Sequence, residues 1–187
     1  MVRLRVRSEA RRRRVGGSRP LCAAIGLAGV LMLLASATAD AAPTITIVPS
    51  PSPNPWRNAL AAVDAHGGKN VWAVGYQESS SGLRQTLIER WNGTSWVVYP
   101  SPNEFTRFNR LMGVANVPFS KDSWAVGDGW SSTGPYLAEI VRWQGSSWQT
   151  VAASRPGTTS DLYGVAAVST SDAWAVGEYT DGATERR

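Results

Sequence analysis

The tetrapeptide WAVG occurs three times in this chain, at residues 72–75, 124–127 and 174–177. The sequences LAAV (60–63), LMGV (111–114) and LYGV (162–165) precede the three copies at nearly constant distances. The sequences WNGTSW (91–96) and WQGSSW (143–148) follow the first two copies, each beginning 19 residues after the WAVG tryptophan. Agreement over most of a unit indicates that the chain repeats one supersecondary structure, because such units bury their apolar surface by stacking on one another.

Each unit predicts four short strands with turns between them. The first strand is centred on 60–64, 111–117 or 162–168, and the second carries WAVG. TLIERW or AEIVRW forms the third strand, and SWVVYP or SWQTV forms the fourth. Asn92-Gly93 supplies the positive φ angles of a tight hairpin between the third and fourth strands. No segment beyond the N-terminal region shows helical periodicity.

The expected fold class is therefore all-β, a β-propeller-like array of four-stranded antiparallel blades with two full blades and a partial one. The expected segments are an N-terminal strand and a Pro/Ser-rich linker at 40–59, blade 1 at 60–110, blade 2 at 111–161 and a partial blade 3 at 162–187.

Strand geometry gives WAVG one bulky side and one small side, because successive side chains point to opposite faces. Tryptophan and valine share one face, and alanine and glycine share the other. The bulky face of one sheet can then pack on the small face of the next, so we expect the repeated residues to be structural. These residues are Trp72, Gly75, Trp91, Trp96, Trp124, Gly127, Trp143, Trp148, Trp174 and Gly177.

The number of strands does not complete a ring. The sequence TITIV (44–48) aligns with a fourth strand, two full units follow, and the third unit ends after its second strand, which predicts eleven strands. A propeller closes with about 4–8 blades. We expect either a piece of a longer protein or self-association through the open blade edges.

The N-terminal segment has the pattern of a secretory signal peptide, residues 1–39. Arginines precede the apolar run LCAAIGLAGVLMLLASATA, and cleavage is expected after Ala39 or Ala41. An uncleaved membrane anchor is the alternative, and the remainder is exported in either case. Eight of the 19 basic residues and one of the 14 acidic ones lie before residue 40, so the mature chain carries a net charge of −2. This charge argues against a nucleic-acid partner.

The WAVG and WNGTSW units resemble the repeats of secreted bacterial β-propeller proteins, which are similar to kelch and BNR-type propellers. The resemblance covers residues 44 to about 180. The chain differs from true kelch units, which carry a Gly-Gly pair at a position where these units have none. It also differs from sialidase Asp-boxes, whose Ser-x-Asp-x-Gly pattern is not met by STSDAW. The resemblance implies a propeller scaffold and no particular activity.

The connections between the second and third strands, and between units, vary most within the chain. YQESSSGLR (76–84) corresponds to DGWSSTGPY (128–136), and PSPNEFTRFNR (100–110) corresponds to ASRPGTTSD (153–161). Binding residues concentrate in loops on a rigid scaffold. The candidate binding residues are therefore Tyr76, Phe105, Arg107, Phe108, Trp130 and Tyr136. Ordinary solvated loops are the alternative interpretation.

The residues needed for catalysis are few. His66 lies in a turn, and the only cysteine, Cys22, lies in the predicted signal peptide, so we expect no Cys/His zinc site and no Ser-His-Asp triad. Four carboxylates, those of Glu78, Glu104, Asp128 and Glu178, could converge on one face as a glycosidase pair does. The sequence favours an exported, non-catalytic module without a cofactor that binds a protein or a glycan. The alternative is part of a carbohydrate-active enzyme, of the glycoside hydrolase or lyase type, whose catalytic residues lie mostly in further blades.

Overall fold

The computed structural model describes residues 4–7, 44–182 and 184–186. These described residues belong to two units, a smaller one before Pro49 and a larger one from Pro49 onward. In the smaller unit, β1 (Leu4–Arg7) pairs antiparallel with β2 (Thr44–Ile47). The sequence predicted residues 44–48 as the fourth strand of a blade, whereas here the alternating segment Leu4–Arg7 supplies the pairing partner. The rest of the predicted signal peptide lies outside the described residues.

The larger unit contains three antiparallel sheets in chain order. The first sheet comprises β3 (Arg57–Ala65), β4 (Val71–Glu78), β5 (Arg84–Trp91) and β6 (Trp96–Tyr99). The second comprises β7 (Phe108–Asn116), β8 (Asp122–Trp130), β9 (Leu137–Gln144) and β10 (Trp148–Val151). The third comprises β11 (Thr159–Ala167), β12 (Ala173–Asp181) and β13 (Thr184–Arg186). Each sheet is a meander, in which every strand pairs with the next one along the chain.

The all-β prediction is confirmed for the described residues, which contain no helix and therefore none that could span a membrane. The eleven predicted strands correspond to β2 through β12, and the structure adds the short strands β1 and β13. β13 begins the third strand of the last sheet, which the sequence predicted to be missing, and it pairs with β12. No sheet closes on itself within the described part of the chain.

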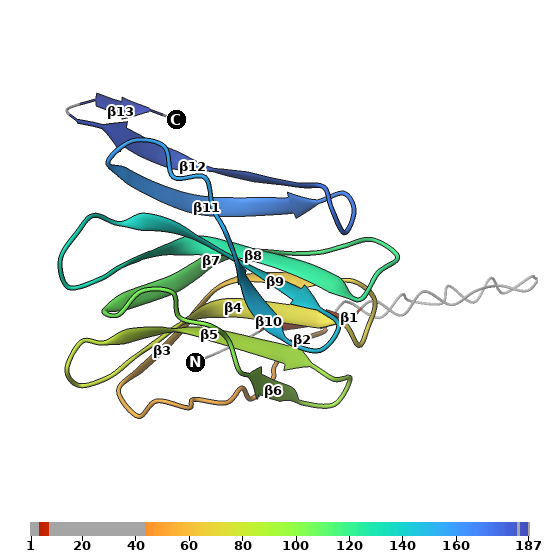
Figure 1. Ribbon diagram of the computed structural model, residues 1–187. Coiled ribbons are helices and arrows are strands. Elements are labelled where there is room, and N and C mark those ends of the chain that lie inside the picture. Colours follow the sequence, from red (N-terminus) through yellow and green to blue (C-terminus); the bar gives the residue numbers. More distant parts are fainter. Residues whose placement is uncertain (1–3, 8–43, 183, 187) are drawn as a thin grey trace, which may run out of the picture. The chain divides into compact units, whose positions relative to one another are not determined.

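The sheets of the larger unit are stacked (Figure 1), and their first strands make much of the contact. β7 contacts β3, β4 and β5 of the first sheet, and β11 contacts β7, β8 and β9 of the second. Gly113 of β7 lies so close to β11 that a Cβ on it would be 3.0 Å from the Cα of Gly164. Small residues in the first strands therefore let neighbouring sheets approach closely.

The first strand of each sheet carries a β-bulge at the same repeat position. The register shifts between Leu60 and Ala62, between Leu111 and Gly113, and between Leu162 and Gly164. The WAVG glycines lie opposite these bulges. A Cβ on Gly75, Gly127 and Gly177 would lie 2.0, 1.9 and 1.9 Å from the carbonyl oxygens of Ala59, Arg110 and Asp161. The glycine is thus required by a close backbone approach, and a flat packing face is a second consequence of it.

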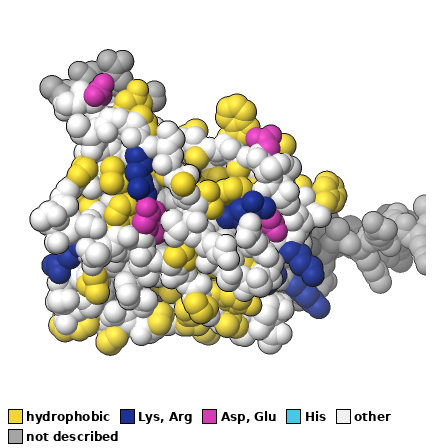
Figure 2. Space-filling view, viewed as in Figure 1, with side chains coloured by type: hydrophobic (Ala, Val, Ile, Leu, Met, Phe, Trp, Pro, Cys, Tyr) yellow, Lys and Arg dark blue, Asp and Glu magenta, His cyan; other side chains and the backbone are white. Residues whose placement is uncertain are grey.

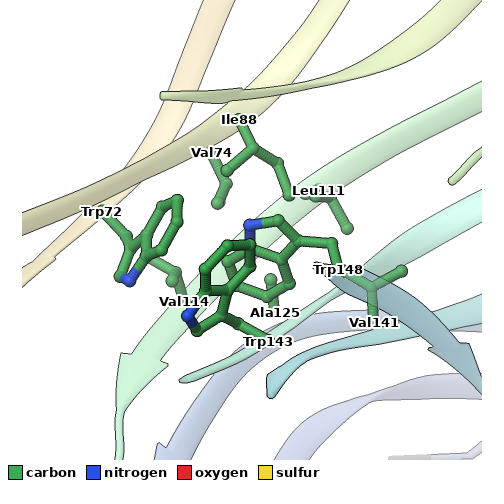
Figure 3. Close-up of a cluster of buried hydrophobic side chains, with 9 residues drawn as sticks. All are labelled: Trp72, Val74, Ile88, Leu111, Val114, Ala125, Val141, Trp143 and Trp148. Carbon is green, nitrogen blue, oxygen red and sulfur yellow. The ribbon is translucent and has the colours of Figure 1, made fainter. Parts of the chain in front are cut away.

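The main core lies between the first and second sheets (Figure 3). Its buried members are Trp72, Val74 and Ile88 of the first sheet and Leu111, Val114, Ala125, Val141, Trp143 and Trp148 of the second. The Trp72 ring centroid lies 5.0 Å from that of Trp143 and 5.1 Å from that of Trp148. Trp72 and Val74 share the cluster with Ala125 of the next WAVG, as the alternation of large and small faces predicts.

The three WAVG tryptophans differ in burial, although all were expected to be structural. Trp72 is fully buried, Trp124 is half-buried beneath the Arg142 guanidinium, and Trp174 is 71% exposed. The difference follows from the stacking, since no described sheet covers the face of the third sheet that carries Trp174 and Val176. The environment of a repeated residue therefore depends on its position in the stack.

This gradient predicts unequal effects of the same substitution. Trp72→Ala should lower the free energy of unfolding by about 3–5 kcal/mol, because it removes a large aromatic side chain from a packed core. Trp174→Ala is the matched control and should change it by about 0.5 kcal/mol or less. Chemical denaturation of both variants measures the difference. Equal destabilisation would contradict the packing described.

Candidate binding surface

Short backbone contacts join the sheets at the end that carries the variable connections, here called the variable edge. Its connections are residues 79–83, 100–107, 131–136 and 152–158. The Arg84 N–H donates to the Arg107 carbonyl oxygen (3.1 Å), and the Arg107 N–H donates to that of Trp130 (3.3 Å). The Ser160 N–H donates to the Tyr136 carbonyl oxygen (3.0 Å). These bonds fix the connections of one sheet against the next.

Arginine and aromatic side chains alternate along the variable edge. The Arg57 and Arg84 guanidinium carbons lie 5.4 and 4.5 Å from the centroid of the Tyr76 ring. Arg84 also lies 4.6 Å from the Phe108 centroid, and Arg110 lies 5.4 Å from it. This row of Arg57, Tyr76, Arg84, Phe108 and Arg110 runs from the first sheet to the second. Cation–π contacts of this kind hold aromatic rings in fixed orientations.

The row continues into a group of three aromatic rings on the second sheet. Phe108 and Tyr136 meet edge to face at 5.4 Å, and Trp130 and Tyr136 are tilted with centroids 5.9 Å apart. Tyr136 is 41% exposed, and Phe108 and Trp130 are half-buried. The structure thus brings together four of the six predicted binding residues, counting Tyr76. The expected loop placement is wrong for Tyr76, Phe108 and Trp130, which lie at or near the ends of β4, β7 and β8.

The arginines of this edge are paired with carboxylates. Arg84 Nε lies 2.8 Å from Glu78 Oε2, and Arg57 lies 3.7 Å from the same oxygen. Arg110 Nε lies 2.7 Å from Asp128 Oδ1. The face drawn in Figure 2 shows basic and acidic side chains side by side with hydrophobic side chains around them. The edge therefore offers aromatic faces and arginine N–H donors whose positive charge is largely compensated by Glu78 and Asp128.

The two remaining predicted residues lie differently. Phe105 is 9% exposed, and its backbone N–H donates to Asn109 Oδ1 (2.8 Å), while Asn109 Nδ2 donates back to its carbonyl oxygen (2.7 Å). Arg107 is exposed and donates to the Ser81 carbonyl oxygen (3.1 Å). Sequence reasoning missed the role of Asn109, although Asn58 stands at the same repeat position and bonds Asn54 in the same way. Phe105 thus anchors its loop, and Arg107 connects two loops.

The four carboxylates considered for catalysis are each held by a partner. Arg84 holds Glu78, Arg155 holds Glu104, Arg110 holds Asp128, and the Tyr163 hydroxyl donates to Glu178. A fifth carboxylate, that of Glu139, was missed by sequence reasoning. It is fully buried where the first sheet has Leu87, a substitution that comparison of the repeats could have found.

Burial raises the pKa of both Glu139 and Asp128. Desolvation raises the pKa of Glu139 to about 8, against a weak bond at 3.4 Å from the Glu104 N–H. Desolvation also raises the pKa of Asp128 to about 6, although Arg110 opposes the shift. Raised pKa values are what a general acid needs. Both carboxyl groups are, however, 0% exposed, so neither presents an oxygen to a substrate on the surface.

The described part of the chain contains no group of side chains arranged to bind a metal ion, and its histidine lies in an exposed turn. His66 is exposed in its turn and meets Phe119 edge to face at 6.4 Å. No group of three or more His, Cys, Asp or Glu side chains that could hold a metal ion occurs among the described residues.

Comparison with family models, curated proteins and solved structures found no match to this chain.

The buried Glu139 predicts a pH-dependent stability. The unfolded carboxyl ionises near pH 4.5 and the folded one near pH 8, so the folded state loses stability as pH rises through this interval. Glu139→Gln should remove this loss, so that the variant gains melting temperature over the native protein at pH 8 and not at pH 4. Thermal melts across this range provide the measurement. Parallel pH profiles would show that Glu139 is not held protonated.

Proposed function

We propose that this chain is an exported, non-catalytic β-propeller module, with an incomplete ring, that binds a glycan or a protein at the variable edge. Three features support the propeller assignment. The sheets are antiparallel meanders in chain order, they share one bulge position, and their first strands contact one another. The signal-peptide pattern of residues 1–39 supports export.

The observation that carries the binding function is the group of Phe108, Trp130 and Tyr136. The Tyr136 ring, which is 41% exposed, contacts both the Phe108 and the Trp130 rings at the end of the sheet, and this arrangement offers preorganised stacking faces. Aromatic faces bind the C–H face of a sugar ring or an apolar peptide side chain. Arg57 and Arg84 share Glu78, and Arg110 pairs with Asp128, so most of the positive charge beside the rings is compensated, which disfavours a polyanion. These properties favour a glycan over a protein ligand.

Glu139 and Asp128 support a second candidate function, part of a carbohydrate-active enzyme. Their raised pKa values fit acid–base chemistry. A carboxyl group in the place of Leu87 costs stability unless it is fully hydrogen-bonded, and such a cost is typical of groups with a functional role. The complete burial of Glu139 and Asp128 weighs against this function. Hydrolysis assays of native protein and Glu139→Gln on the glycans bound in the experiment below separate the two functions.

A glycan array tests the binding proposal with three proteins. The native protein should bind, and the double variant Trp130→Ala, Tyr136→Ala should bind at least tenfold more weakly, since stacking contributes on the order of 1 kcal/mol per ring. Phe119→Ala is the matched control, because Phe119 is fully exposed in the turn between β7 and β8, at the other end of the sheet. It should bind as the native protein does.

Two outcomes would contradict the proposal. The first is a native protein that binds no glycan, and the second is a double variant that retains native affinity. N-terminal sequencing of the same preparation tests export, since the secreted protein should begin at Asp40 or Ala42. Soluble cytoplasmic protein that retains Met1 would contradict that part.

A further inference from the structure

A cavity of ≈ 270 Å³ lies in the first sheet at the end opposite the variable edge. Its walls come from the turn before β4, from β5, from the hairpin turn after it and from β6. The lining residues are Lys69, Arg90, Asn92, Val97 and Tyr99. Two cations, one amide, one aliphatic side chain and one aromatic side chain thus surround one small space.

The two cations are held in place by neighbours that leave donors available. Arg90 lies over the Trp72 ring, 4.9 Å from its centroid, and its Nη2 donates to Asn70 Oδ1 (3.0 Å). A guanidinium has five N–H donors, so others remain free to bind a ligand. The aliphatic stem of Lys69 lies beside Gly93, where a Cβ would be 3.2 Å from its Cγ.

The second sheet has a carboxylate beside its stacked arginine, and the first sheet has an amide at that position. At the equivalent position, Arg142 lies over Trp124 and its Nη2 lies 2.5 Å from Asp122 Oδ2. The first sheet has Asn70 where the second has Asp122. Among the described residues, no carboxylate pairs with Arg90. The same stacked arginine therefore pairs with a carboxylate in the second sheet and with an amide in the first, where the nearest link to a carboxylate runs from Asn70 through Asn116 to Asp64.

We propose that this cavity binds a small carboxylate-bearing ligand. The ligand's carboxylate accepts hydrogen bonds from Arg90 and is attracted by the positive charge of Lys69. It supplies the negative charge that Asp122 supplies in the second sheet. The planar fork of an arginine matches the two oxygens of a carboxylate. Val97, which is 41% exposed, and Tyr99 form an apolar wall for the rest of the ligand.

The cavity volume limits the ligand to about one sugar acid or one amino-acid residue. Pockets for larger organic ligands measure roughly 300–1,000 Å³, and this one is at or below that range. The site is distinct from the variable edge and does not depend on the function proposed above. It adds recognition of a single carboxylate to a chain whose variable edge has its arginines largely paired with carboxylates.

Titration calorimetry with glucuronate and N-acetylglycine tests the proposal, since these probes represent a sugar acid and an amino-acid carboxylate. At least one of them should bind the native protein, while glucose should not bind detectably, and sulfate should bind more weakly because it has no group to contact Val97 and Tyr99. The probe that binds identifies the source of the carboxylate. Binding should weaken as salt is added, because a charge pair at a surface cavity is screened.

Two variants locate the site. Asn70→Asp places beside Arg90 the acid that the second sheet already carries beside Arg142, so it should fold and should weaken carboxylate binding at least tenfold. Lys69→Ala removes the second cation and should also weaken binding. Lys121→Ala, at the equivalent turn of the second sheet, is the matched control and should leave affinity unchanged. Thermal melts check that each variant is folded.

The proposal is overturned if neither carboxylate probe binds, or if glucose or sulfate binds as tightly as the carboxylates do. It is also overturned if Asn70→Asp and Lys69→Ala both retain native affinity. Loss of glycan binding at the variable edge leaves these results unaffected, so the two sites can be judged separately.

Discussion

The larger unit depends on the packing of one sheet's tryptophan face against the small residues of the next. Trp72 and Val74 lie in one buried cluster with Ala125, and the Trp72 ring lies 5.0 and 5.1 Å from the rings of Trp143 and Trp148. This arrangement needs a first strand that bulges toward the second, and Gly127 lets the Arg110 carbonyl oxygen approach to a distance at which no Cβ fits. A tetrapeptide with one large face and a glycine at its end satisfies both demands, which explains why the chain repeats it.

Positions where the repeats differ carry the chemistry of the chain. Glu139 of the second sheet stands at the repeat position of Leu87 in the first, and Asp122 of the second sheet stands at that of Asn70. The first change places a carboxyl group in a fully buried position, and the second leaves Arg90 without a carboxylate among the described residues. The scaffold is maintained by the shared residues, so a single altered position can change charge without changing the fold.

Much of the fold could be predicted from the sequence because the chain contains three copies of the same strand pattern, which can be compared with one another. The eleven strands and the large-on-small packing follow from alternation and turn residues. The hairpin after Trp91 was also predicted, but its predicted conformation was wrong, because only Gly93 has a positive φ and the Asn92 side chain instead accepts hydrogen bonds from the N–H groups of Thr94 and Ser95. The sequence could not predict that Thr44–Ile47 pairs with Leu4–Arg7, because strand pairing across long separations leaves no local signal. Trp174 is exposed because no described sheet covers its face, and the sequence of one repeat does not indicate whether a neighbouring sheet covers it. The candidate residues Tyr76, Phe108, Trp130 and Tyr136 do come together, but the arginines that order them were not foreseen.

The central claim is that burial against the next sheet, and not the local sequence, determines the stability of each WAVG strand. Hydrogen exchange of the dilute protein tests it directly, because the three segments have identical sequences and hence nearly identical intrinsic exchange rates. The packing predicts the strongest protection in β4 and β8 and the weakest in β12, since exchange reports local opening. Equal protection of residues 72–75, 124–127 and 174–177 would contradict the claim.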